Sequence, residues 1–115
     1  MMLRILVALG LLWPATARAQ QPYVFTPIGV QQYSSLATAT PLTAPTQPPA
    51  PGPPKIIEIC VEGAAVRYRD DGTAPTSSVG IPVAAGTCFQ YAGNIAAIQF
   101  IQQSSGAVID VSYYR

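Results

Sequence analysis

Short segments of alternating apolar and polar residues, separated by turn-forming residues, dominate the second half of this sequence. Residues 56–62 carry isoleucine or valine at every second position, and residues 107–114 repeat the pattern. Such alternation places the two kinds of side chain on opposite faces of a β-strand. Gly, Ser, Asp and Pro separate these segments at intervals of about ten residues. The pattern predicts an all-β fold, either an antiparallel β-sandwich or a jelly-roll-like small barrel.

Several segments fit this strand pattern. We expect strands at residues 28–33, 36–42, 56–62, 65–70, 81–83, 87–91, 95–103 and 107–114. Pro41 limits the second of these to a sheet edge or a bulge, because proline has no N–H to donate. The Ile and Phe content of residues 95–103 favours a strand over the helix that their periodicity would also allow. The Asp, Gly, Pro and Ser residues of segment 70–80 predict a loop.

The N-terminus, residues 1–19, has the organisation of a signal peptide. A short basic start precedes a run of nine apolar residues, and Ala17 and Ala19 supply the small side chains before a cleavage site. A membrane anchor is the alternative, but this run is much shorter than the ~20 residues that span a bilayer. We therefore expect cleavage after Ala19, export to the periplasm or the medium, and no stable membrane insertion. Residues 20–115 would then form a single β-sandwich domain.

A proline-rich segment interrupts this domain at residues 45–54, which hold six of the twelve prolines of the chain. Proline fixes φ and cannot donate to a β-ladder, so the segment is expected to be an exposed loop or spacer. A proline-rich ligand for a recognition domain is the alternative.

Charge excludes two classes of partner. Removal of the signal peptide takes away Arg4 and Arg18 and leaves four basic against five acidic side chains, a net charge of −1. Nucleic-acid binding needs a basic patch that neutralises phosphates, and membrane-surface binding needs clustered Lys and Arg. Neither partner is expected. A surface of Ser, Thr, Gln, Tyr and Ala suits contacts with protein copies or with sugars instead.

Cys60 and Cys88 are the two cysteines of the chain. An oxidising compartment would let them form one intrachain disulfide and would leave no odd thiol. In the chain-entropy model, a loop of this size closed by a disulfide contributes about 3 to 4 kcal/mol. Two buried free thiols, acting as small apolar side chains, are the alternative.

No constellation of catalytic residues is visible. The sequence has no histidine, which removes the commonest general base and the usual nitrogen ligand of zinc. Asp70 and Asp71 are adjacent in an extended segment, so they point to opposite faces and do not form an acid–base dyad. We expect them to accept backbone hydrogen bonds in the turn before Gly72. Clustered oxygens here would suit calcium, but the alternating ligands of a calcium loop are missing. No enzyme activity, cofactor or metal site is predicted.

Charged and aromatic side chains supply a candidate interaction surface. Arg67 and Arg69 alternate with apolar residues, so their guanidinium groups share one face of a strand. They would bind an acidic group on a partner, or pair across strands with Glu58, Glu62 or Asp110. Tyrosine buries a ring and keeps a polar tip, which favours it in interfaces. The predicted surface comprises Arg67, Arg69, Asp70, Asp71, Tyr91, Tyr113 and Tyr114.

The same region resembles a group of small structural proteins of tailed bacteriophages. Tyr68 lies between Arg67 and Arg69, and Asp-Asp-Gly-Thr-Ala-Pro-Thr follows. Further segments similar to that group are residues 29–32, 35–36, 79–83, 98–101 and 111–114. The resemblance covers most of residues 27–115. It implies a β-sandwich that acts as a virion accessory or decoration-like protein, with no catalytic residues.

These observations lead to two functional hypotheses. The first is a non-enzymatic structural or interaction protein, a phage virion accessory or an exported surface component, that works by self-association or by binding other proteins. The second is a secreted carbohydrate-binding module, since β-sandwiches of that class present aromatic side chains to sugar rings.

Overall fold

Eight β-strands make up the described part of the computed structural model, residues 25–44 and 53–115, which contains no helix. The strands are β1 (Pro27–Tyr33), β2 (Thr40–Pro41), β3 (Ile56–Glu62), β4 (Val66–Arg69), β5 (Ile81–Val83), β6 (Cys88–Tyr91), β7 (Gln99–Gln102) and β8 (Val108–Tyr114). The predicted signal peptide, residues 1–19, and residues 45–52 of the proline-rich segment lie outside the described residues.

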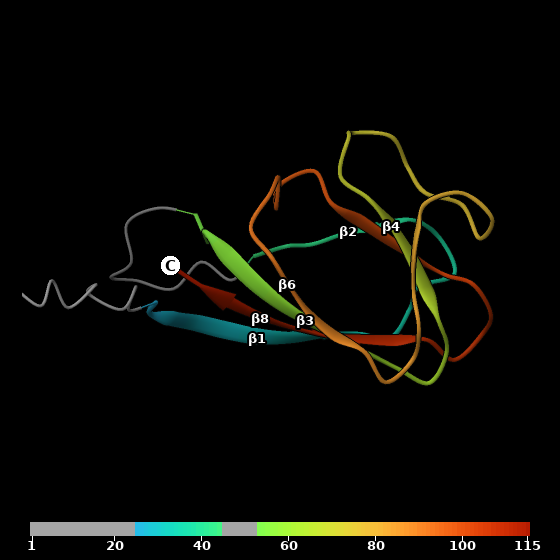
Figure 1. Cartoon of the computed structure of the whole chain (residues 1–115), viewed down its shortest axis with the longest axis horizontal. Coiled ribbons are helices and arrows are strands. Elements are labelled where there is room, and N and C mark those ends of the chain that lie inside the picture. Colours follow the sequence, from blue (N-terminus) through green and yellow to red (C-terminus); the bar gives the residue numbers. More distant parts are fainter. Residues whose placement is uncertain (1–24, 45–52) are drawn as a thin grey trace, which may run out of the picture.

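The strands form two antiparallel four-stranded sheets (Figure 1). The first sheet has the order β1-β8-β3-β6, and the second has the order β2-β7-β4-β5. Among consecutive strands, only β4 and β5 are neighbours in one sheet, so every other connection carries the chain from one sheet to the other. No strand pairing joins the two sheets within the described chain. The predicted all-β fold is confirmed, and its form is an antiparallel sandwich.

The core lies between the sheets and follows the alternation in the sequence. In β3 and β8, the side chains on one face are buried and those on the other are half-buried or exposed. The antiparallel register places Ile59 opposite Val111 and Val61 opposite Ile109, so buried side chains form cross-strand pairs. The fully buried side chains with the largest volume are Tyr113, Phe100, Leu36, Ile57, Ile59, Ile98, Ile109, Val61, Val66 and Val111.

Two predicted strands are much shorter than expected, whereas the others differ by at most one residue at either end. In segment 95–103 only Gln99–Gln102 forms a strand. The residues before it make a turn in which the amides of Ala97 and Ile98 donate to the carbonyl of Asn94, so the helical periodicity of this segment reflects one real turn. Segment 36–42 is a strand only at Thr40–Pro41, at the edge of the second sheet, where proline is tolerated.

Candidate functional site

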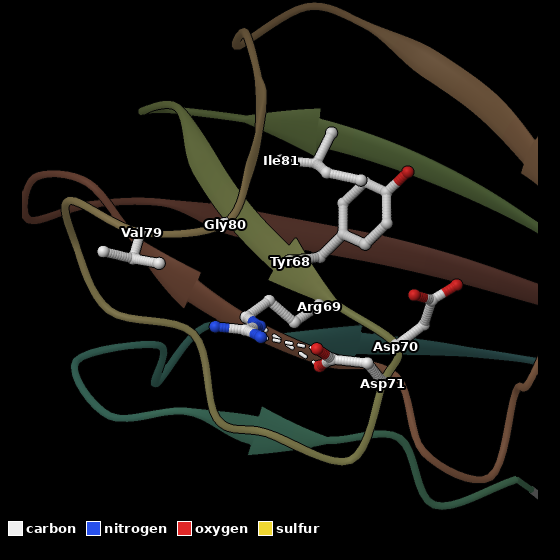
Figure 2. Close-up of a pocket in the computed structure, with 7 residues that line it drawn as sticks. All are labelled: Tyr68, Arg69, Asp70, Asp71, Val79, Gly80 and Ile81. Atoms are coloured by element: carbon white, nitrogen blue, oxygen red, sulfur yellow. Dashed lines mark hydrogen bonds and ion pairs between the residues drawn. The ribbon is translucent and has the colours of Figure 1, made fainter.

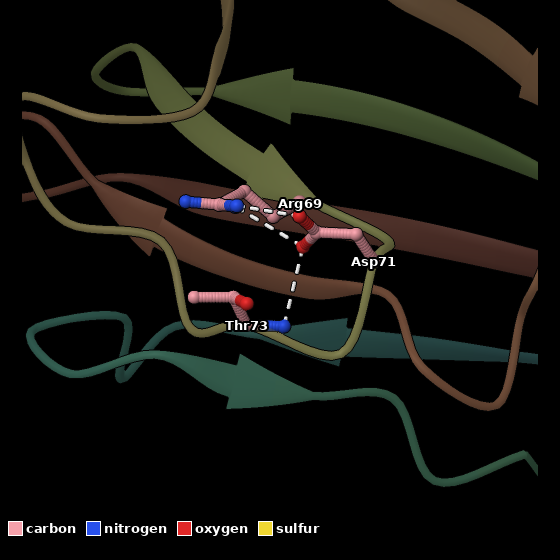
Figure 3. A network of polar contacts seen from close by, with 3 residues as sticks. All are labelled: Arg69, Asp71 and Thr73. Atoms are coloured by element: carbon pink, nitrogen blue, oxygen red, sulfur yellow. Dashed lines mark hydrogen bonds and ion pairs between the residues drawn. The ribbon is translucent and has the colours of Figure 1, made fainter.

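Arg69 and Asp71 form an ion pair at the end of β4 (Figure 3). Arg69 Nε donates to Asp71 Oδ1 at 3.1 Å, and Arg69 Nη2 donates to Asp71 Oδ2. The amide of Thr73 also donates to Asp71 Oδ1, at 3.2 Å. The guanidinium group and this amide lower the pKa of Asp71 from 3.8 to about 2. The predicted backbone hydrogen bond in the turn is therefore confirmed for Asp71, and the carboxylate also holds Arg69 against the loop.

Asp70 points away from Asp71 and toward the first sheet (Figure 2). Its Oδ2 accepts a hydrogen bond of 2.6 Å from the hydroxyl of Tyr91 on β6. Partial burial and this hydrogen bond raise the pKa of Tyr91 to about 12. The two carboxylates therefore serve different partners. As expected from their adjacency, they do not form a dyad, and they do not converge on a common point where a calcium ion would bind.

Arg67 has no acidic partner in the described structure. Its Nη1 donates to the carbonyl of Gly80 at 2.8 Å, and its Nε donates to the carbonyl of Ser77 at 3.2 Å. The expectation that the arginines pair across strands with acidic residues of 56–62 or with Asp110 is wrong, because those residues belong to the first sheet and β4 belongs to the second. Arg67 instead holds the loop between β4 and β5 in place.

The loop that the two arginines fix lines a shallow hollow beside β4 and β5, with a volume of about 250 Å³. Its lining residues are Tyr68, Arg69, Asp70, Asp71, Val79, Gly80 and Ile81 (Figure 2). Val79 and Ile81 expose 52% and 51% of their surface. The hollow thus combines an ion pair with two exposed apolar side chains.

Sequence reasoning identified the charged side of this hollow but missed Val79 and Ile81. Ile81 and Val83 occupy the same face of β5 by alternation, yet Val83 is buried and Ile81 is exposed. Their burial differs because Ile81, opposite Tyr68, is the first residue of a short strand at the edge of the sheet. No local sequence signal distinguishes these two positions.

The predicted tyrosines do not form a surface together. Tyr113 is fully buried, so its assignment to an interaction surface is wrong. Its hydroxyl donates to Gln31 Oε1 at 2.9 Å, and Tyr33 donates to the same oxygen. Burial raises the pKa of Tyr113. Tyr91 and Tyr114 are half-buried, and no tyrosine within residues 25–44 and 53–115 is exposed.

Cys60 and Cys88 form the predicted disulfide. They lie directly opposite each other on β3 and β6, and their sulfur atoms are bonded to each other, which leaves no thiolate for a metal. Glu58 lies close to both sulfurs. Glu62 is on the same outer face of the sheet, and a hydrogen bond with Asp110 raises its pKa. This face is acidic, and its cysteines have a structural role.

The described residues include no helix with the length and hydropathy needed to cross a membrane. No family model, no curated protein and no solved structure matches this chain. The proposed function therefore rests on the residues and on their geometry.

Proposed function

We propose that this protein is a non-enzymatic structural or interaction protein that works by protein–protein association, either as a phage virion accessory or as an exported surface component. The hollow beside β4 and β5 is the observation that carries the proposal. It presents Val79 and Ile81 to solvent next to the Arg69–Asp71 ion pair. Apolar side chains with a polar border are typical of protein contact sites.

The loop in this hollow is held before any partner arrives. Arg67 bonds to two of its carbonyl groups, and the amide of Val79 donates to the carbonyl of Thr76 at 3.2 Å. A surface that is already ordered loses less conformational entropy on binding than a flexible one does. Residues 79–81 are therefore suited to contact a protein without rearrangement.

Export accounts for the disulfide. Disulfides form and persist in oxidising compartments, and Cys60 and Cys88 are paired. Together with the signal peptide expected at residues 1–19, this pairing supports a protein that acts outside the cytoplasm. A carbohydrate-binding role would need a platform of exposed aromatic side chains. Phe25 alone among the described aromatic residues is exposed, and the described tyrosines are buried or half-buried. No observation favours that second hypothesis.

Co-sedimentation of the purified chain with purified virions and with cell-envelope fractions tests the proposal. We expect binding to one of these particles, and we expect Ile81→Asp to weaken it by at least about tenfold, because a charge would be buried in the contact. Thr87→Asp is the matched control, since Thr87 is exposed and lies outside the hollow. Failure to bind either particle contradicts the proposed function. Binding that survives Ile81→Asp contradicts the hollow as its surface.

A further inference from the structure

The four edges of the two sheets are protected unequally. β2 has two residues and contains Pro41, β5 has three and contains Pro82, and β6 has four. β1 has seven residues and no charged side chain, and its proline is at the first position. Short strands, prolines and charges keep sheet edges from pairing with other chains. β-Bulges also protect edges, and the one in β1 is confined to its first residues, between Pro27 and Gly29. From Gly29 to Tyr33, β1 is therefore the one described edge with five regularly paired residues, no charge and no proline.

The hydrogen bonds at the end of β8 show in which direction the peptide groups of β8 and β1 point. The amide of Thr26 donates to the carbonyl of Arg115 at 2.8 Å, and the amide of Arg115 donates back at 2.9 Å. The amide of Lys55 donates to the carbonyl of Tyr114 from the other side. Because peptide groups alternate in direction along a strand, the odd-numbered residues of β8 direct theirs toward β1.

This alternation leaves free peptide groups at the centre of β1. Val111 pairs with Gln31 and Ile109 pairs with Tyr33, so Gln31 and Tyr33 direct their peptide groups toward β8. The peptide groups of Val30 and Gln32 therefore point away from the sheet. No described strand lies beyond them.

Val30 also presents the most exposed large apolar side chain of the described chain, with 72% of its surface accessible. Gln32 is already engaged, because its Nε2 donates to Asp110 at 2.9 Å. The edge therefore offers a free backbone, an apolar centre and no charge. These properties suit a neutral extended strand as the partner, and β1 is itself such a strand.

We propose that β1 pairs in antiparallel fashion with β1 of a second copy of this chain, about a two-fold axis at Val30. This inference deepens the proposed function and rests on it, since it names a second copy as one protein partner. Val30 is the midpoint of Pro27–Tyr33, so the two strands overlap along their length. The register shift between Pro27 and Gly29 leaves the central residues 29–31 of each copy to pair regularly. Val30 then lies opposite Val30 of the second copy, and their outward peptide groups exchange both hydrogen bonds.

The proline of β1 does not obstruct this register. Pro27, which lacks an N–H, falls opposite Tyr33 of the second copy, and the peptide groups of Tyr33 face β8. No hydrogen bond between the copies is therefore lost there. One pair of seven-residue strands forms a small interface, so the dimer is weak and depends on protein concentration.

Sedimentation velocity of the purified chain, at concentrations up to about 1 mM, tests the proposal. The sedimentation coefficient of the wild type should rise with concentration toward that of a dimer. Val30→Lys places two like charges opposite each other and should weaken dimerisation by at least about tenfold. Thr87→Lys adds the same charge at an exposed position outside the hollow, next to β6 at the opposite edge of the sheet, and it should behave as the wild type. A wild type that stays monomeric, or a Val30→Lys variant that dimerises equally well, overturns the proposal.

Cysteine cross-linking tests the register without relying on Val30→Lys. Val30→Cys should form an intermolecular disulfide, because directly opposed residues lie within bonding distance. Gln32→Cys is the matched control on the same face, and its two copies would lie about 13 Å apart, too far to bond. Cross-linking at Gln32 but not at Val30 overturns the register.

The two proposals can fail separately. A monomer that still binds virions or envelope fractions would refute the dimer alone, and a dimer that binds neither would refute the virion or envelope role alone.

Discussion

Gly63 and Gly72 both have positive φ, at 75° and 84°, but their surroundings differ. A Cβ on Gly63 would lie 2.1 Å from the carbonyl oxygen of Gly106, whereas a Cβ on Gly72 would meet nothing within 4 Å. Gly63→Ala should therefore destabilise the fold by about 4 kcal/mol or more. Gly72→Ala should cost only the strain of the left-handed conformation, about 1 kcal/mol. Urea denaturation of both variants measures the difference, and equal losses would contradict this packing.

The Arg69–Asp71 pair makes a prediction about acid stability. The pKa of Asp71 is lowered from 3.8 to about 2 in the folded chain. Its contribution to stability is therefore present above about pH 4 and is lost as the pH falls toward 2. The contribution should be small, because both side chains are accessible to solvent.

An NMR titration of the side-chain carboxyl groups checks this prediction directly. Asp71 should titrate near pH 2 in the wild type. In Arg69→Gln its midpoint should move up toward the ordinary value, because the hydrogen bonds from the Arg69 guanidinium contribute most to the lowered pKa. A midpoint that Arg69→Gln leaves unchanged would show that the ion pair does not exist in solution.

At the scale of the elements, the disulfide ties β6 to β3, where β6 is a four-residue edge strand. It closes a loop with a sequence separation of 28 residues. Cys60→Ala combined with Cys88→Ala should lower the free energy of unfolding by about 3 to 4 kcal/mol in the chain-entropy model. Urea denaturation of the double variant and of the wild type, with and without a reductant, measures this. A double variant as stable as the oxidised wild type would contradict a structural role.

Alternation in the sequence predicts most strands. It does not always predict which side chains of a strand face the core. Ile28 and Val30 are two residues apart and should share a face. Ile28 instead packs against the core while Val30 is exposed, because the register shifts between Pro27 and Gly29. A β-bulge of this kind inserts one residue and reverses the alternation. Nothing in the local composition marks the shift, so the exposed centre of β1 could not be found from sequence.

The residues that Arg67 and Arg69 bond to could not be predicted from the sequence, for a different reason. β3 and β4 are consecutive in the chain and separated by three residues, which suggests a hairpin. They belong instead to opposite sheets, so the acidic residues of β3 and the arginines of β4 never meet. Strand pairing depends on the whole topology and not on neighbouring residues. The ion pair joins Arg69 and Asp71, which are only two residues apart. The turn pattern of the sequence nevertheless predicts only backbone hydrogen bonds for Asp71.

At the scale of the whole molecule, the charged residues of β4 and the following loop have a structural role. Asp70 accepts a hydrogen bond from Tyr91 on the first sheet. Arg67 donates hydrogen bonds to carbonyl groups of the loop, and Asp71 forms an ion pair with Arg69. The large apolar side chains exposed beside them are Val79 and Ile81. Within the described residues, the molecule thus fixes one apolar surface beside the second sheet and leaves β1 as a long, uncharged edge of the first. Both features favour association with other proteins.

Hydrogen exchange of the chain, free and bound to whichever particle it co-sediments with, tests this account most directly. Residues 79–81 line the hollow, so a bound partner would cover them and their amides should exchange more slowly in the complex. Residues 104–106 form an exposed turn outside the hollow, and their exchange should not change. Slower exchange confined to residues 79–81 and their neighbours is the predicted result. Unchanged exchange at residues 79–81 under saturating binding would contradict the hollow as the protein contact site.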